Sequence, residues 1–105
     1  MTNIVENKVT LTGTVASEKP ASLMRKLCKH WSHKLEVQYD EVRGEVNFGT
    51  GSCELDASQS GVLAIRVNAP DPETAGRLRE VVERHLERFA VHETLTFQWS
   101  AIENS

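Results

Sequence analysis

Hydrophobic and polar residues alternate along five stretches of the 105-residue chain. This two-residue period predicts β-strands, each with one buried face and one exposed face. Residues 8–16 show it most clearly, because threonines stand at Thr10, Thr12 and Thr14 between apolar residues and glycine. The other alternating stretches are residues 35–39, 46–57, 63–69 and 95–99. A sheet built from these strands is expected to expose one polar face.

Two further stretches place apolar residues three and four positions apart, which is the period of a half-buried helix. The first has start signals at Ser17 and Pro20 and runs to about Ser32. The second opens at Asp71-Pro72, where aspartate can cap free amides and proline fits the first turn. The apolar stripes are Met24, Leu27, Cys28 and Trp31 in the first helix, and Ala75, Leu78, Val82, His85, Leu86 and Phe89 in the second.

The alternation changes parity inside the stretch 46–57. Val46 and Phe48 are apolar at even positions, whereas Cys53 and Leu55 are apolar at odd ones, with Gly49-Thr50-Gly51 between them. A one-residue slip turns every following side chain to the other face. A β-bulge or sharp bend at these glycines is the simplest explanation, and a tight hairpin is the alternative.

The predicted order is β-α-β-β-β-α-β, which indicates an α+β fold in a single domain spanning residues 1–105. Turn residues at 40–44 join the second and third strands into a hairpin. Because each strand has one apolar face, we expect a two-layer sandwich. One mainly antiparallel sheet of about five strands is covered on one face by two helices, as in a relative of the ferredoxin-like fold.

Composition and charge argue against binding to nucleic acid or to a membrane surface. The formal charge of -3 provides no general attraction for nucleic acid or for an anionic membrane. The chain has no signal-like leader and no run of about 18 apolar residues, so a cytoplasmic location is expected. In that reducing compartment Cys28 and Cys53, which lack close ligand spacing, are expected to be free thiols. A monomer or weak homodimer is expected.

Three segments carry a family resemblance: LCKHWSHKLEVQYDE at 27–41, GSCELDA at 51–57 and HLERFAVHETLTFQW at 85–99. With them the chain resembles, over nearly its whole length, the small bacterial proteins known as domain of unknown function 2218. The resemblance implies a compact single domain without an established activity, and relatives that accompany siderophore-iron handling proteins. It assigns no functional residue.

Histidines suggest a metal site near the end of the first helix. His30 and His33 lie only ~60° apart around a helix axis, so both imidazoles can face one ion. Cys28 is ~200° from His30, and a thiolate ligand would therefore have to be Cys53. The alternative is that the two histidines and Lys34 complement the negative end of the helix dipole.

Basic residues suggest a ligand site on the same helix. Arg25 and Lys29 belong to a local basic patch suited to a carboxylate-rich ligand or an acidic partner, or they form an ordinary solvated helix face. His85, on the second apolar stripe, is either a core-edge histidine bonded to a carbonyl or an acid/base group. The remaining members of the patch are Lys26, Lys34 and Arg43.

No nucleophile motif or phosphate-binding glycine pattern is present, and no catalytic residue is predicted. The sequence therefore favours an accessory or binding module for an unidentified small molecule or protein partner. The alternative is a metal-binding or metal-dependent protein, linked through the family resemblance to siderophore-iron handling. No cofactor is expected unless a transition metal binds.

Overall fold

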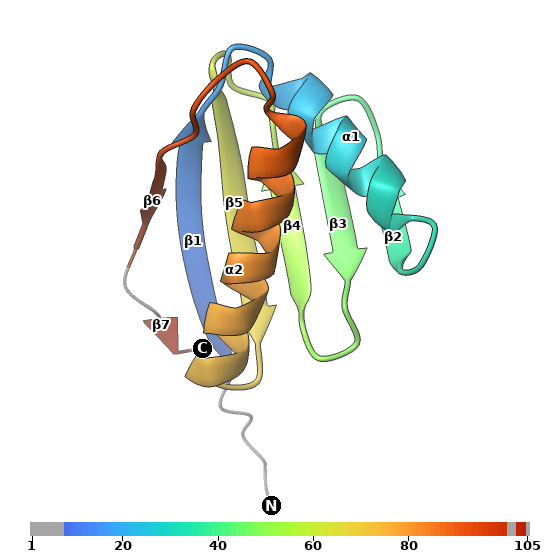
Figure 1. Ribbon diagram of the computed structural model, residues 1–105. Coiled ribbons are helices and arrows are strands. Elements are labelled where there is room, and N and C mark those ends of the chain that lie inside the picture. Colours follow the sequence, from blue (N-terminus) through green and yellow to red (C-terminus); the bar gives the residue numbers. More distant parts are fainter. Residues whose placement is uncertain (1–7, 101–102, 105) are drawn as a thin grey trace, which may run out of the picture.

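A computed structural model describes residues 8–100, 103 and 104. Two helices, α1 (Pro20–Trp31) and α2 (Pro72–Phe89), lie on one face of a single antiparallel sheet, as Figure 1 shows. The predicted two-layer α+β architecture is confirmed. The strands are β1 (Val9–Ala16), β2 (Glu36–Tyr39), β3 (Arg43–Asn47), β4 (Ser52–Asp56), β5 (Val62–Ala69), β6 (Phe97–Trp99) and β7 (Glu103–Asn104).

The strands follow the order β2-β3-β4-β5-β1-β6, and β7 also pairs with β1. All paired strands are antiparallel. Four adjacent strands, β4-β5-β1-β6, have the connectivity of a ferredoxin-like sheet, and the β2–β3 hairpin extends this sheet beyond β4. There are more strands than the five predicted, because the predicted third strand is two strands and β7 follows the last.

At Gly49-Thr50-Gly51, where the apolar residues switch from even to odd positions, the chain forms a hairpin. The preferred prediction of a bulge is wrong. The amide of Phe48 donates to the carbonyl of Gly51 at 2.8 Å, which closes the turn between β3 and β4. Gly49 has φ +85°, a left-handed conformation that glycine adopts without strain. Val46 then pairs with Cys53 in register, so both point into the core although one number is even and one odd.

The two helix starts differ from each other. At α2 the prediction is confirmed, since the Asp71 carboxylate accepts a hydrogen bond from the amide of Thr74 at 2.7 Å. At α1 the predicted serine cap is wrong, because the N-cap residue is Lys19 and no side chain caps the helix. The Ser17 hydroxyl instead donates to Glu93 at 2.7 Å. Proline in the first turn of α1 is confirmed.

The core fills the space between the helices and the inner face of the sheet. Both thiols belong to it, with 0% of Cys28 and Cys53 exposed, and both are free. On the surface of α2, Glu73 and Arg77 form an ion pair at 2.6 Å. No helix in the described part of the chain is long and apolar enough to cross a membrane. The largest fully buried side chains are Met24, Leu27, Leu55, Leu63 and Leu86.

Candidate functional site

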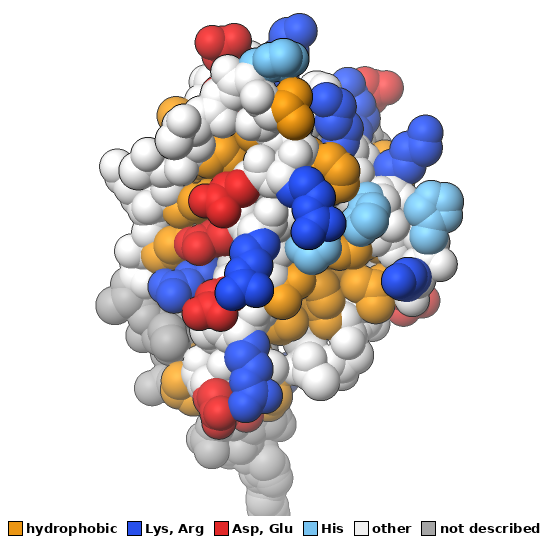
Figure 2. Space-filling model, viewed as in Figure 1, with side chains coloured by type: hydrophobic (Ala, Val, Ile, Leu, Met, Phe, Trp, Pro, Cys, Tyr) orange, Lys and Arg blue, Asp and Glu red, His pale blue; other side chains and the backbone are white. Residues whose placement is uncertain are grey.

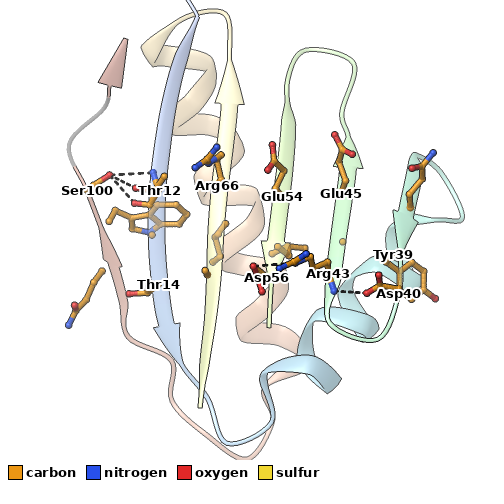
Figure 3. Close-up of a pocket in the computed structure, with 18 residues that line it drawn as sticks. Thr12, Thr14, Tyr39, Asp40, Arg43, Glu45, Glu54, Asp56, Arg66 and Ser100 are labelled. Atoms are coloured by element: carbon orange, nitrogen blue, oxygen red, sulfur yellow. Dashed lines mark hydrogen bonds and ion pairs between the residues drawn. The ribbon is translucent and has the colours of Figure 1, made fainter. Parts of the chain in front are cut away.

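The polar face of the sheet is not covered by either helix (Figures 1 and 3). Cross-strand pairing aligns its side chains in rows, and the middle row runs through Glu45, Glu54, Arg66 and Thr12 on four adjacent strands. Together with the strand ends these residues line a hollow of about 1130 Å³. The uncovered face therefore presents a broad concave polar surface of the kind that can receive a ligand or partner.

Hydrogen bonds hold several acidic groups at the border of this hollow. Asp40 accepts from the amides of Val42 and Arg43, both at 2.9 Å, and these bonds lower the pKa of its carboxyl. Asp56 lies 3.4 Å from the guanidinium of Arg43. Its pKa is lowered chiefly by hydrogen bonds from Ser58, with a further contribution from Arg43. These border groups are already engaged within the protein.

The charged side chains of the middle row make fewer hydrogen bonds and ion pairs than those at the border. Glu54 accepts a hydrogen bond from the side-chain amide of Asn68 at 3.2 Å. Within the described residues, neither Glu45 nor Arg66 makes a side-chain hydrogen bond or ion pair, although Glu54 stands between them in register. Glu45 and Glu54 are directly opposite one another, and such like-charge pairs are unfavourable. A cation placed over this pair would remove the repulsion.

Acidic groups outnumber basic ones by four to two among the residues that line this hollow. The sequence shows the polar alternation of these strands, but it does not single out the acidic residues, since cross-strand neighbours are set by register. The acidic groups are Asp40, Glu45, Glu54 and Asp56, and the basic ones are Arg43 and Arg66.

On the opposite side of the molecule, histidine side chains gather where α1 and α2 meet, bordered by lysines and arginines (Figure 2). The ring centroids of His30 and His85 are 5.6 Å apart. The described ring contacts of His30 are with His85 and Phe89, not with His33. His33 lies in the exposed turn after α1. The structure thus brings His30, predicted as a metal ligand, into contact with His85, predicted as a ligand-binding residue on the other helix.

Backbone contact fixes the orientation of His85. Its Nδ1 lies 2.8 Å from the carbonyl oxygen of Val81, one helical turn earlier. Its ring also contacts the indole of Trp31, with centroids 5.0 Å apart. Both the helix and the aromatic neighbour therefore hold this half-buried imidazole in place.

Cys53 is not part of this histidine cluster. It is completely buried on the inner face of β4, and its pKa is raised chiefly by burial, with smaller effects of Cys28 and Glu54. Burial likewise raises the pKa of Cys28 to about 11. Protonated thiols beneath the helices are poor metal ligands. No group of three or more His, Cys, Asp or Glu side chains in the described residues is placed to hold a metal.

The basic patch of α1 is partly neutralised. Arg25 donates to the carbonyl oxygen of Glu41 at 3.0 Å, and its guanidinium lies 3.8 Å from the carboxylate of the same residue. Arg25 thus ties the helix to the turn between β2 and β3. Lys29 is exposed in the last turn of α1.

Comparison with known proteins places this fold in a family. Residues 12–100 match the family described as an uncharacterized protein conserved in bacteria, DUF2218. The NMR structure of PA4090 from Pseudomonas aeruginosa is similar, with 36% identity, a TM-score of 0.75, and coverage of 88% of this chain and 95% of that one.

A de novo designed protein, Foldit4, has 17% identity and a TM-score of 0.47 over 90% of this chain and 97% of its own. No curated protein matches. The family match covers residues 12–100, and the similarity to PA4090 covers 88% of this chain. The chain therefore belongs to the DUF2218 family of uncharacterized proteins conserved in bacteria.

Proposed function

We propose that this protein is a binding module whose uncovered sheet face receives a positively charged segment of a partner protein. The observation that supports this most directly is the opposed pair Glu45 and Glu54 at the centre of the polar hollow. Two carboxylates on neighbouring strands, without a described ion pair, present acceptors in a fixed spacing. A guanidinium group with its five donors matches such acceptors well.

The surrounding groups favour a peptide-like partner over a small cation. Arg66 adjoins Glu54 in register and offers a donor for a carbonyl or carboxylate of the same segment. Thr12 and Thr14 continue the polar rows on β1. An extended basic segment crossing several strands engages these groups in turn, and charge complementarity speeds its encounter with the face.

A titration followed by amide NMR tests the proposal. The labelled protein is titrated at low salt with a short arginine peptide with blocked ends, and separately with the matching glutamate peptide. We expect the arginine peptide to shift amide signals of β3, β4 and β5, and the glutamate peptide to leave them in place. Shifts confined to α1 and α2, equal responses to both peptides, or no response would contradict the proposal.

Charge variants identify the contact groups. The double variant Glu45→Gln, Glu54→Gln should weaken binding by about two- to fivefold, because two exposed ionic contacts are worth roughly 0.5–1 kcal/mol in total. Glu80→Gln, Glu87→Gln is the matched control, since it removes the same charge from exposed positions of α2. Equal weakening in both variants would show that net charge alone, and not this face, attracts the peptide.

The alternative function is metal binding. The observation that favours it is the contact between His30 and His85 across the two helices. This pair lies on the helical layer and is independent of the uncovered face.

A further inference from the structure

The imidazoles of His30 and His85 converge from two helices. His30 is in the last turn of α1, and His85 is in the last two turns of α2. Their centroid distance is 5.6 Å, and the ring planes are inclined by 44°. The two side chains are 55 positions apart in sequence, and the packing of α1 against α2 brings them together.

The tautomer of His85 leaves a nitrogen available. A backbone carbonyl is only an acceptor, so Nδ1 donates its hydrogen to the oxygen of Val81. In the neutral ring the lone pair is then on Nε2. Histidines that ligate metals commonly donate their other ring N–H to a carbonyl in this manner, which fixes the ring and raises its basicity.

The separation of the rings fits one shared ion. Metal–nitrogen bonds to histidine are about 2.0–2.1 Å, which places each ring centre roughly 3.2 Å from the metal. Two rings at angles of about 105–120° around the ion then have centroids roughly 5.1–5.5 Å apart. The observed 5.6 Å lies just beyond this range, so the separation of the two rings is compatible with one shared ion after a small side-chain adjustment.

We propose that His30 and His85 form a two-imidazole site for a divalent transition ion, with copper preferred over zinc. Imidazole nitrogen favours copper in the divalent series. Since the described residues offer no third His, Cys, Asp or Glu ligand, water completes the coordination and binding is labile. Phe89 contacts the ring of His30 and Trp31 contacts the ring of His85, so aromatic groups border the site. This site is an alternative to the predicted pairing of His30 with His33.

Copper and zinc titrations of the full chain test this site. Copper quenches tryptophan fluorescence at short range, and Trp31 contacts His85 directly. We expect His30→Ala and His85→Ala each to weaken copper affinity by at least about tenfold, and zinc heats to fall in parallel. His33→Ala and His92→Ala are matched controls, because both remove an exposed histidine from a turn; they should change affinity less than about twofold.

Folding is checked in the same experiment. His85 is half-buried, so circular dichroism and the unfolding midpoint of each variant are measured without metal, and His85→Gln serves as a second variant of similar size. Unchanged copper affinity in folded His30→Ala or His85→Gln would overturn the proposal. Equal losses in the control variants, or no binding of copper and zinc to the unaltered chain, would also overturn it.

Discussion

The indole ring of Trp99 fills the space above Gly13 in which a side chain would otherwise stand. A Cβ atom built on Gly13 would lie 2.5 Å from Cε3 of Trp99. The two residues are paired in register on β1 and β6, and the indole N–H donates to the carboxylate of Glu83 on α2. The edge strand is thereby fastened both to the sheet and to the helical layer.

Replacing Gly13 with alanine should therefore destabilise the protein. The added methyl group forces the indole aside, and overpacking of this kind costs roughly 1–3 kcal/mol. Gly76→Ala is the matched control, because no atom lies within 4 Å of a Cβ at this helical position. It should stabilise α2 by roughly 0.5–1 kcal/mol. Urea unfolding of the two variants measures both changes, and a neutral Gly13→Ala would contradict the packing.

The contact between Ser17 and Glu93 predicts a double-mutant coupling. Ser17 is 6% exposed, and its hydroxyl donates to Glu93, which also accepts from the amide of Glu18 at 3.2 Å. Glu93→Ala leaves these donors without their acceptor and should cost roughly 1–3 kcal/mol. The loss in Ser17→Ala, Glu93→Ala should be smaller than the sum of the single losses. Additive effects in chemical unfolding would show that the bond contributes nothing.

The buried thiols predict a loss of stability at alkaline pH. Burial raises the pKa of Cys28 to about 11, whereas an unfolded thiol titrates near about 8.5. Between these values the unfolded chain has lost a proton that the folded chain keeps, so stability falls as pH rises above about 8.5. At pH 10 the cost is on the order of 1–2 kcal/mol.

Unfolding of Cys28→Ala across this pH range provides the comparison. Its baseline stability is lower because a buried group is lost, but its decline with pH should be shallower than that of the unaltered chain. Thiol labelling should be slow for both cysteines in the native state and rapid after denaturation, since neither is exposed. Rapid native labelling, or identical pH slopes, would contradict the burial.

The cap of α2 predicts an acid-sensitive contribution to stability. The amide of Thr74 lowers the pKa of Asp71, so the folded state favours the carboxylate. The stabilisation is present above the unfolded pKa of about 3.9 and is lost as pH falls through the lower folded value. Asp71→Ala should lower the unfolding midpoint at neutral pH and have less effect in acid.

Asp71→Asn separates charge from hydrogen bonding at this cap. Asparagine is also a good cap, so most of the stability should remain while the pH dependence contributed by this residue disappears. Chemical unfolding at several pH values provides the measurement. If Asp71→Ala destabilises the protein equally in acid and at neutral pH, the negative charge of Asp71 does not contribute to stability.

The sequence alone determined the layers of this protein and most of its elements. Alternation predicted which face of each strand is buried, and Asp71-Pro72 marked the start of α2, because these signals act between residues a few positions apart. The same short range explains the error at the central glycines. A bulge and a hairpin place the same residues in the core, and only pairing of β3 with β4 distinguishes them.

Tertiary structure alone decided which residues meet. His30 contacts His85, and Ser17 is bonded to Glu93, across 55 and 76 positions of the chain. Glu45 and Glu54 are nearer in sequence, but they face each other only because the hairpin sets their register. Hydrophobic periodicity predicts whether a face of a helix or strand is buried. It does not identify the residues that pack against that face. The partners follow from the strand order and the helix packing, which depend on the whole chain folding at once.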